Sequence, residues 1–329
     1  MKKNIAVITG GDSSEEVISV KSAALIKNSI NSNKYNSYLV YIKGNEWVVK
    51  SENGSPDVKI DKNDFSFIQN NKKIIINGAY LIIHGPPAEN GKFQAYLEML
   101  DLPYVGPRVL QASLTFNKEI TKQYLSLIGI KSSKGILVRK GEQINIHEIA
   151  LEIGFPCFVK PNEAGSSFGV TKIYHEDQME DAVTTALTED STVLIEKFMK
   201  GIEVTCGVFK LNGETKVLPV TEIVSTKDFF DYEAKYTPGI SDEITPARIS
   251  EEMTKKCQET TVKIYNFLQL TGISRIDYII CNNELNLLEV NTIPGMSNES
   301  IIPKQLRIAG YNITDIITGI IDEELVSKS

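Results

Sequence analysis

The chain has 329 residues, of which 42% are hydrophobic and 23% are charged, and its formal net charge at pH 7 is −7. This length allows about two or three domains, and the composition is that of an ordinary globular protein. An acidic chain without a basic block is not expected to bind nucleic acid as its main partner.

The first residues, MKKNIAVITGG, carry two lysines and then a short apolar run that ends in a Gly-Gly pair. Such a run is too short for the core of a signal peptide or for a membrane span. The cysteines show no metal-ligand spacing, which favours free thiols in a reducing compartment. They are Cys157, Cys206, Cys257 and Cys281. We therefore expect a cytoplasmic protein without a membrane segment.

The first elements predict a parallel α/β sheet. Residues 5–8 are typical of a buried strand, a Gly-Gly turn follows, and an amphipathic helix is expected from about Glu15 to Ile30. The turn lacks the G-x-G-x-x-G spacing of a dinucleotide-binding fold, so NAD binding is not expected. Glu15 lies where an acidic side chain favours the helix dipole. Residues 79–83 predict the next strand, and His84 follows as either a satisfied histidine or a substrate contact.

Two lysines in the middle of the chain are candidates for binding phosphate. Lys160 ends an apolar strand and precedes the small-residue loop 164–167, whose glycine and successive backbone amides can approach an anion closely. This is not a Walker P-loop, because no G-K-[ST] opens a helix. Lys118 lies in a helix expected over residues 114–127, where on its own it would be interpreted as a solvated lysine.

Residues 193–203 predict a cleft between two domains. The run VLIEKFMKGIE is an apolar strand that Gly201 breaks, and it carries the charged pair Glu196-Lys197. An exposed charged pair is the alternative, but the apolar residues on both sides favour an interdomain cleft. Residues 229–239 are aromatic and charged without clean periodicity, and we expect them to form a structured loop.

The stretch RIDYIICNNELNLLEVN predicts a β-hairpin. Residues 275–280 alternate charged and apolar side chains, Asn282-Asn283 is typical of a turn, and residues 285–291 return as an antiparallel strand. A hairpin with a polar face turned to solvent is the alternative. The apolar residues of the second strand indicate instead that it is covered on at least one side.

Folding the hairpin can bring three oxygen-bearing side chains together. Glu289 and Asn291 are two residues apart and share a face, and Asp277 comes from the facing strand. Two carboxylates and an amide oxygen suit Mg²⁺, or Mn²⁺, bound mostly through water and substrate phosphates. Pro294 has no amide hydrogen, so the chain must leave the sheet as a loop that places Gly295 beside the acids.

This last segment carries a family resemblance. Residues 287–303, LLEVNTIPGMSNESIIP, resemble in residue types and order the last motif of the D-alanine–D-alanine ligases, which are ATP-grasp enzymes. The resemblance covers almost the whole chain, in five separated motifs that follow the family's order. One of them departs from the pattern, because the H-G-x-x-G-E-D-G of the family is HGPPAENG at residues 84–91.

The resemblance implies a three-domain ATP-grasp architecture. The fold class is α/β, with α+β character in the C-terminal half and a parallel sheet in the N-terminal domain. The expected domains are residues 1–106, which bind substrate, residues 107–196, the central ATP-grasp subdomain, and residues 197–329, the catalytic domain. ATP would lie between the second and third domains. Family members are usually homodimers, so a homodimer is expected.

The resemblance also implies roles for individual residues. ATP would be bound by Lys118, Lys160 and Lys235 at the phosphates, by Glu196 and the backbone of Lys197 and Met199 at the adenine, and by Glu203 at the ribose. Two metal ions would be held by Asp277, Glu289 and Asn291. The two D-alanine molecules and the reacting atoms would be contacted by Glu15, Ser166, Tyr236, Arg275, the Gly295 amide, Ser300 and Ile301. Within this set, Ser166 and Tyr236 would form a hydrogen-bonded triad with Glu15.

The implied reaction is the ATP-dependent ligation of two D-alanine molecules through an acyl phosphate, for peptidoglycan precursor synthesis. The Lys-Tyr pair at residues 235–236 favours an amine as the second substrate. Another ATP-grasp carboxylate–amine ligase, such as a D-alanine–D-serine ligase, remains an alternative because of the altered loop 84–91. A nucleotide-binding relative without catalysis is the second alternative, and the intact acids of the hairpin speak against it.

Overall fold

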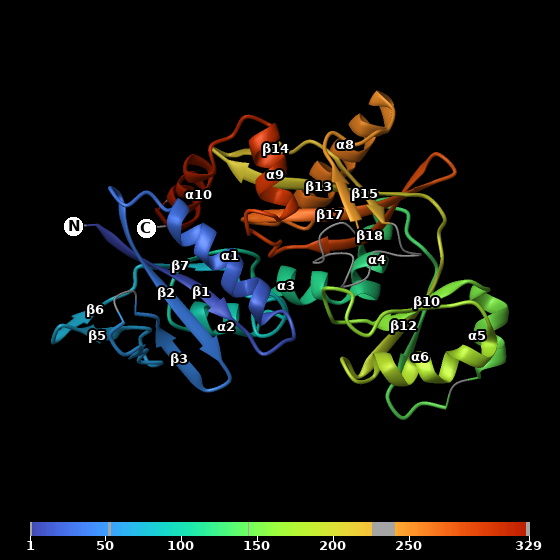
Figure 1. Cartoon of the computed structure of the whole chain (residues 1–329), viewed down its shortest axis with the longest axis horizontal. Coiled ribbons are helices and arrows are strands. Elements are labelled where there is room, and N and C mark those ends of the chain that lie inside the picture. Colours follow the sequence, from blue (N-terminus) through green and yellow to red (C-terminus); the bar gives the residue numbers. More distant parts are fainter. Residues whose placement is uncertain (1, 52–53, 144, 226–240, 327–329) are drawn as a thin grey trace.

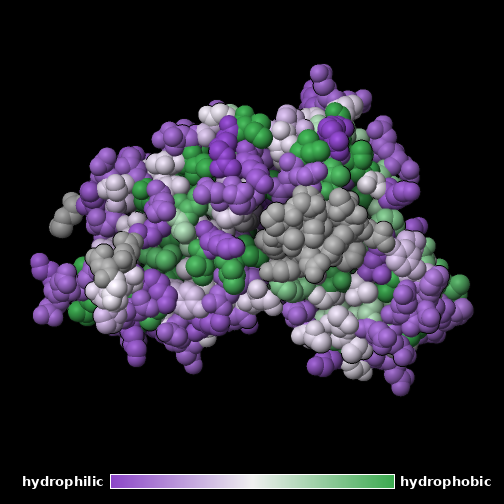
Figure 2. Space-filling model, viewed as in Figure 1, coloured by the Kyte–Doolittle hydropathy of each residue, from purple (hydrophilic) through white to green (hydrophobic). Residues whose placement is uncertain are grey.

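The computed structural model describes residues 2–51, 54–143, 145–225 and 241–326, and three large β-sheets form its framework (Figure 1). Each sheet comes from a separate stretch of the chain. Hydrophobic side chains collect in three buried clusters, and hydrophilic residues cover most of the face shown in Figure 2. In the part of the chain that the structure describes, no helix is long and apolar enough to cross a membrane.

The N-terminal sheet contains the predicted parallel strands. Its order is β4 (Val58–Lys59), β3 (Glu46–Val49), β2 (Tyr35–Lys43), β1 (Lys3–Gly10), β7 (Gly78–Leu81) and β8 (Tyr104–Val105). Strands β2, β1, β7 and β8 run parallel, and β3 and β4 are added antiparallel. Residues 5–8 are fully buried, as in a central parallel strand. Glu15 and His84 follow the carboxyl ends of the adjacent strands β1 and β7, so they lie at the same edge.

Two helices and one hairpin complete this part of the chain. Helix α1 (Glu16–Ser29) packs against β1, and α2 (Lys92–Met99) contacts α3 (Val109–Phe116). Strands β5 (Phe67–Gln69) and β6 (Lys72–Ile74) pair only with each other among the described strands.

The single helix expected around Lys118 is wrong, because two helices meet there. Helix α3 (Val109–Phe116) ends and α4 (Lys118–Ser126) begins at Asn117, whose backbone is extended. The Asn117 side chain accepts a hydrogen bond from the N–H of Ile120 at 3.0 Å. Asparagine is a preferred N-cap, which explains the break and makes Lys118 the first residue of α4.

The middle sheet is antiparallel and presents one face to two helices. Its order is β11 (Thr171–Ile173), β10 (Cys157–Pro161), β12 (Thr192–Lys197) and β9 (Gly135–Arg139). Helix α6 (Met179–Ala186), preceded by the short 3-10 helix η1 (Glu176–Gln178), packs against β10, and α5 (Ile146–Ile153) packs against β9 and β12. Cys157 and Val159 belong to the core under these helices. The alternate residues Phe158 and Lys160 therefore point to the opposite face.

The C-terminal sheet contains the predicted hairpin. Its order is β16 (Ser241–Ile244), β15 (Thr221–Ser225), β13 (Ile202–Leu211), β17 (Ile273–Cys281) and β18 (Glu284–Asn291), and β14 (Glu214–Val217) also pairs with β13. All pairs are antiparallel. Asn282 and Asn283 have φ angles of 51° and 61°, as a two-residue hairpin turn requires, so the predicted turn is confirmed. Helix α8 (Glu251–Phe267) packs against β13 and β14.

The last helices return to the N-terminal part of the chain. Helix α9 (Ile301–Ile308) is followed by α10 (Ile313–Ile321) and the π-helical segment η2 (Asp322–Val326). Helix α10 contacts α1, and the largest buried cluster joins Ile5 of β1 to Ile302 and Ile317. The three large sheets span residues 3–105, 135–197 and 202–291. The domain limits at 106 and 196 stay a prediction.

Candidate active site

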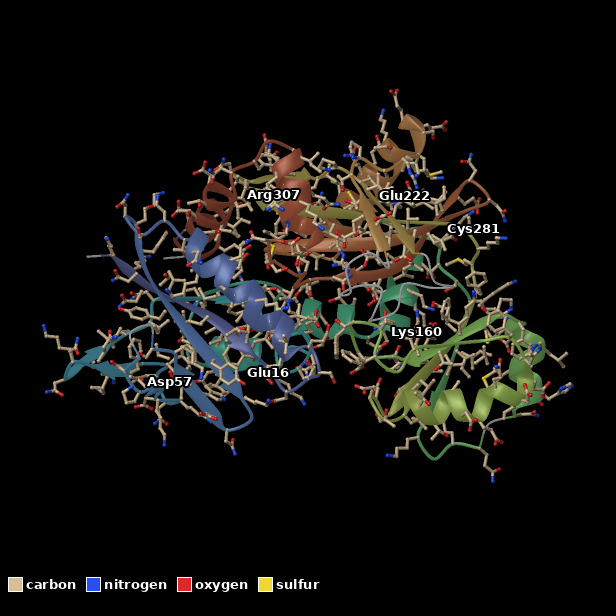
Figure 3. The ribbon with its side chains drawn as sticks, viewed as in Figure 1. Glu16, Asp57, Lys160, Glu222, Cys281 and Arg307 are labelled. Carbon is tan, nitrogen blue, oxygen red and sulfur yellow. The ribbon has the colours of Figure 1, made fainter. Side chains whose placement is uncertain are left out.

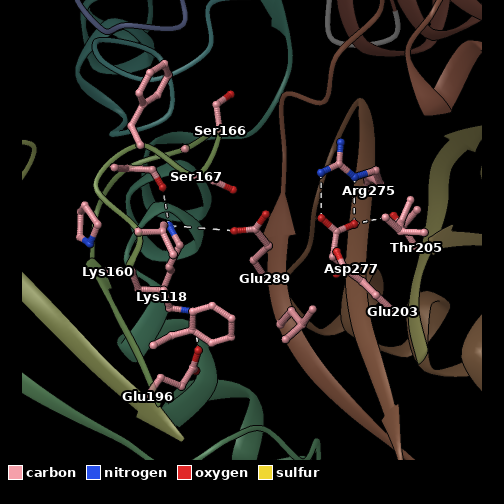
Figure 4. A pocket seen from close by; sticks show the side chains of 18 of the residues that line it. Lys118, Lys160, Ser166, Ser167, Glu196, Glu203, Thr205, Arg275, Asp277 and Glu289 are labelled. Atoms are coloured by element: carbon pink, nitrogen blue, oxygen red, sulfur yellow. Dashed lines mark hydrogen bonds and ion pairs between the residues drawn. The ribbon is translucent and has the colours of Figure 1, made fainter. Parts of the chain in front are cut away.

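A cavity of about 170 Å³ lies between the middle and C-terminal sheets. Figure 4 shows one wall with the lysines and the small-residue loop, and a facing wall with the acids of β17 and β18. The predicted site residues that line it are Lys118, Lys160, Ser166, Glu196, Glu203, Arg275, Asp277, Glu289 and Ile301.

Lys118 is a cavity residue rather than a solvated helix lysine. Its side chain is 12% exposed, and its Nζ lies 4.0 Å from Glu289 Oε2 on the facing wall. The ammonium also donates a hydrogen bond to the carbonyl of Ala164 in the small-residue loop. Burial lowers the pKa of Lys118, although the nearby Glu289 carboxylate acts in the opposite direction. The capped start of α4 thus places a cation between the loop and the hairpin.

The small-residue loop also reaches the N-terminal sheet. Ser166 Oγ donates a hydrogen bond to Glu15 Oε1, which is 151 positions away in the sequence, and this confirms the predicted contact. A Cβ atom on Gly165 would lie 2.5 Å from Glu15 Oε2, so glycine allows the close approach. Ser166 and Ser167 have φ angles of 49° and 60°, a conformation that costs free energy for residues other than glycine and is typical of functional loops.

Two residues predicted for this group, Lys235 and Tyr236, lie outside the described residues. Their predicted contacts with phosphate and with Ser166 therefore stay predictions.

The altered loop 84–91 still lies beside Glu15. A Cβ atom on Gly85 would be 3.6 Å from Glu15 Oε2. Glu89 Oε2 accepts a hydrogen bond from the N–H of Gly85 at 2.7 Å. Burial, together with the negative charge of Glu15, raises the pKa of Glu89. The sequence analysis missed Glu89, whose one signal was its place in the altered motif.

His84 is a buried, neutral residue that fixes the end of β7. Its backbone N–H donates a hydrogen bond to Ser19 Oγ at 2.9 Å, and its ring atom Nε2 lies 3.4 Å from Ser22 Oγ. Burial lowers the pKa of His84 to about 4, and the positive charge of Arg275 acts in the same direction. These contacts favour the interpretation of a satisfied histidine.

On the facing wall, Asp277 is held by three side chains. Arg275 donates from Nε to Oδ1 at 2.9 Å and from Nη2 to Oδ2 at 2.8 Å, and Asn291 Nδ2 donates to Oδ2 at 3.0 Å. Thr205, which the sequence analysis missed, also donates its hydroxyl to Oδ1. The strand register sets Asp277 opposite Glu289 and Arg275 opposite Asn291, so the predicted grouping on the hairpin is confirmed.

Glu196 lies at another side of the cavity, between two lysines. Lys122 Nζ is 2.8 Å from Glu196 Oε1, and the ammonium of Lys160 pairs with Oε2. Burial alone would raise the pKa of Glu196, but the two lysines hold it at about 2. Lys160 lies where the middle sheet faces the C-terminal sheet (Figure 3). Lys122 was not predicted from the sequence, although it lies one helical turn after Lys118 and shares its face.

Four further predicted site residues, Lys197, Met199, Gly295 and Ser300, are not among the residues that line the cavity. The N–H of Lys197 donates to Lys134 O at 2.9 Å. Ser300 is the N-cap residue of α9, and its Oγ would lie 3.0 Å from a Cβ atom on Gly295. The loop after β18 therefore brings Gly295 and Ser300 together.

Comparison with known proteins decides the family. The family model "D-ala D-ala ligase N-terminus" matches residues 4–107, and "D-ala D-ala ligase C-terminus" matches residues 126–322. The chain belongs to the D-alanine–D-alanine ligase family. A relative from Bacteroides fragilis, named D-alanine–D-alanine ligase, is 46% identical over 325 residues, which are 98% of this chain and 100% of that protein.

Solved structures of the family share the fold. The VanG D-Ala:D-Ser ligase from Enterococcus faecalis has a TM-score of 0.86 and 30% identity, covering 98% of this chain and 99% of that one. The D-alanine–D-alanine ligase from Bacillus anthracis complexed with ATP has a TM-score of 0.77 and 27% identity, covering 99% and 98%. The predicted ATP-grasp fold is therefore confirmed, and the chain is a ligase.

In this ligase, residues from three distant segments of the chain lie at one site. The start of helix α1, after β1, supplies Glu15, the middle sheet supplies Lys160 and the hairpin supplies Asp277. These parts meet through the small-residue loop, which contacts Glu15 on one side and lines the cavity on the other.

Proposed function

We propose that the protein joins two D-alanine molecules to D-alanyl-D-alanine while ATP is converted to ADP and phosphate, as a step in peptidoglycan precursor synthesis. The observation that carries this proposal is the hydrogen bond from Ser166 to Glu15, because it links the carboxylate that would bind the substrate ammonium to a loop beside buried lysines. We also propose that the protein works as a cytoplasmic homodimer with domains at residues 1–106, 107–196 and 197–329.

The proposed nucleotide site uses the cations of one wall. Lys118 and Lys160, with Lys235, bind the phosphates, and the amides of the small-residue loop can add hydrogen bonds to the same anion. Glu196 and the backbone of Lys197 and Met199 meet the adenine, with the Lys197 carbonyl favoured because its N–H is already bonded. Glu203, which lines the cavity, takes the ribose hydroxyls.

The hairpin acids are the proposed metal ligands. Within the described ranges, no group of three or more His, Cys, Asp and Glu residues is arranged to hold a metal ion. The set Asp277, Glu289 and Asn291 nevertheless fits Mg²⁺ or Mn²⁺, because its oxygen atoms suit a hard cation that keeps water and phosphate as further ligands. Two such ions would offset the negative charge of the transferring phosphoryl group.

The proposed chemistry needs no protein nucleophile. Glu15, positioned by Ser166 and Tyr236, binds the ammonium of the first D-alanine. The carboxylate of that D-alanine attacks the γ-phosphorus, which releases ADP and leaves an acyl phosphate. The free amine of the second D-alanine then attacks the acyl carbon, the peptide bond forms and phosphate leaves.

Arg275 of β17 and the residues after β18 serve the second half of this reaction. Arg275 and the Gly295 amide stabilise the tetrahedral oxyanion, since donors aimed at a developing negative charge lower the barrier. Ser300 and Ile301 hold the second substrate near its carboxylate and methyl groups. The bidentate pair between Arg275 and Asp277 fixes the guanidinium for this role.

A D-alanine–D-serine ligase is the second candidate function. It is favoured by two observations, the altered loop 84–91 and the similarity to the Enterococcus faecalis D-Ala:D-Ser ligase at a TM-score of 0.86. The two functions differ only in the second amino acid, so a substrate comparison separates them.

The test is a phosphate-release assay with ATP and Mg²⁺, in which products are separated by mass. We expect phosphate release and dipeptide with D-alanine alone, and neither with L-alanine. In an equimolar mixture of D-alanine and D-serine, the alanyl dipeptide should predominate. Phosphate release without dipeptide, or a mixed dipeptide as the main product, would contradict the proposal.

A further inference from the structure

A buried group of charged side chains lies behind the proposed adenine site. It consists of Lys122, Glu119, Glu196 and Lys160. Lys122 is 4% exposed, and its Nζ lies 2.8 Å from Glu119 Oε2 and 2.8 Å from Glu196 Oε1. Lys160 pairs with Glu196 Oε2. Each oxygen of the Glu196 carboxylate therefore has its own ammonium partner.

The surroundings hold Lys122 in place. The N–H of Glu119, at the start of α4, donates to Asn162 Oδ1 at 3.1 Å, which docks the helix on the loop after β10. A Cβ atom on Gly135 would lie 3.0 Å from Lys122 Nζ and 2.7 Å from Leu194 Cδ1. Strand β9 thus carries no side chain where the ammonium lies, so the fold leaves room for this charge.

The two lysines differ in what they can reach. Lys160 lines the cavity beside the small-residue loop, whereas Lys122 is not among the lining residues. Lys160 therefore has two alternative partners, Glu196 and the phosphates of a nucleotide. When Lys160 leaves Glu196 and binds phosphate, Lys122 is the ammonium that still pairs with the carboxylates of Glu196 and Glu119.

We propose that Lys122 is a positioning residue for the nucleotide, which holds Glu196 in place and supplies the counter-charge that allows Lys160 to move to the phosphates. This inference rests on the proposed function, in which Glu196 accepts the adenine amino hydrogens and Lys160 binds phosphate. A buried carboxylate without a partner is strongly unfavourable. Without Lys122, the pair between Lys160 and Glu196 should therefore persist and compete with ATP.

The first test is Lys122→Met in the full-length enzyme, which removes the charge and keeps most of the volume. We expect the KM for ATP to rise by about 10- to 150-fold, the range for losing a hydrogen bond to a charged group. The kcat and the KM for D-alanine should change far less. ITP lacks the adenine amino group, so the preference for ATP over ITP should narrow. Lys122→Arg, which keeps the charge, should restore most of the ATP affinity.

Glu119→Gln separates this role from a merely structural one. It removes an acid from the same buried group and leaves the ion pair between Lys122 and Glu196, so the KM for ATP should not rise. Lys131→Met is a matched control, because its ion pair with Glu284 has side chains that are 58% and 53% exposed. Thermal unfolding of each variant checks the fold. If Lys122→Met does not fold, Lys122→Gln takes its place, since its amide can still donate to Glu196.

Three results would overturn the inference: a wild-type KM for ATP in the folded Lys122→Met or Lys122→Gln variant, a rise in the KM for ATP of the same size in Glu119→Gln, or a rise in the KM for D-alanine as large as that for ATP. Each of them is measured against a wild-type enzyme that makes dipeptide. A wild-type enzyme that makes no dipeptide is a different result, because it refutes the proposed function itself.

Discussion

Gly165→Ala should uncouple the small-residue loop from Glu15. An alanine Cβ would lie 2.5 Å from Glu15 Oε2 and 2.7 Å from Oε1, and real Cβ atoms essentially never come within 3.0 Å of a heavy atom outside their own residue and its two chain neighbours. The carboxylate or the loop must therefore retreat. The φ angle of Gly165 lies outside the left-handed region, so alanine itself fits the backbone.

The expected size of the effect follows from the contact that is lost. Moving the carboxylate breaks its hydrogen bond with Ser166 Oγ. A hydrogen bond to a charged group contributes about 1.5–3 kcal/mol, which corresponds to about 10- to 150-fold in an equilibrium or rate ratio. We therefore expect kcat/KM for D-alanine to fall by about this factor, with a smaller change in the KM for ATP.

The measurement is steady-state phosphate release with D-alanine and ATP varied in turn. Gly129→Ala is the control. A Cβ atom there would meet nothing within 4 Å, and the φ angle of Gly129 is +76°, so this substitution strains the backbone without displacing a neighbouring group. That variant should lose thermal stability and keep kcat/KM. A Gly165→Ala enzyme with unchanged kcat/KM for D-alanine, or with an equal change for ATP, would refute the assigned role of Glu15.

Three further predictions concern the facing wall, with the acids of β17 and β18, and the end of β7. Asp277→Asn and Glu289→Gln should each abolish turnover and preserve the fold, since they remove proposed metal ligands; wild-type-like activity at ordinary Mg²⁺ would contradict the metal assignment. Thr205→Val removes the hydroxyl that donates to Asp277, so kcat should fall by about 10-fold and half-maximal activity should need more Mg²⁺; an unchanged Mg²⁺ titration would show that Thr205 has no such role. His84 has a pKa of about 4 in the folded protein and of about 6.5 in the unfolded chain, so the unfolded state binds more protons between these two pH values. The free energy of unfolding should therefore fall as the pH falls from 6.5 to 4, by about 3 kcal/mol in total. Chemical denaturation of His84→Asn between pH 7 and pH 5 should show a weaker decline than the wild type, and parallel declines would argue against a buried neutral histidine.

The sequence predicted best those features whose determinants are neighbours in the chain. The hairpin of β17 and β18 follows from local alternation and from Asn282-Asn283, both of which adopt the left-handed backbone that a tight turn needs. The parallel pairing of β1 follows similarly from a buried run before a glycine turn. In both cases the pattern needs no information about distant segments.

Contacts between segments that are distant in the sequence could not be predicted from local patterns. Lys122 pairs with Glu196 across 74 positions, and Thr205 bonds Asp277 across 72 positions. Nothing local separates Lys122 from an exposed helix lysine, because its partner is placed only when β12 pairs with β9 and β10. The contact of Ser166 with Glu15 spans 151 positions, and the family resemblance rather than periodicity predicted it.

The contacts of Asp277 bear on how the proposed metal site gains its affinity. The Arg275 guanidinium already neutralises this carboxylate, and Asn291 and Thr205 donate to the same two oxygens. Glu289 has Lys118 at 4.0 Å, so its negative charge is also partly balanced. Mg²⁺ dehydrates reluctantly and prefers anionic oxygen ligands. We therefore propose that these residues alone would bind Mg²⁺ weakly, and that the phosphates of ATP would supply much of the charge that holds the proposed ion.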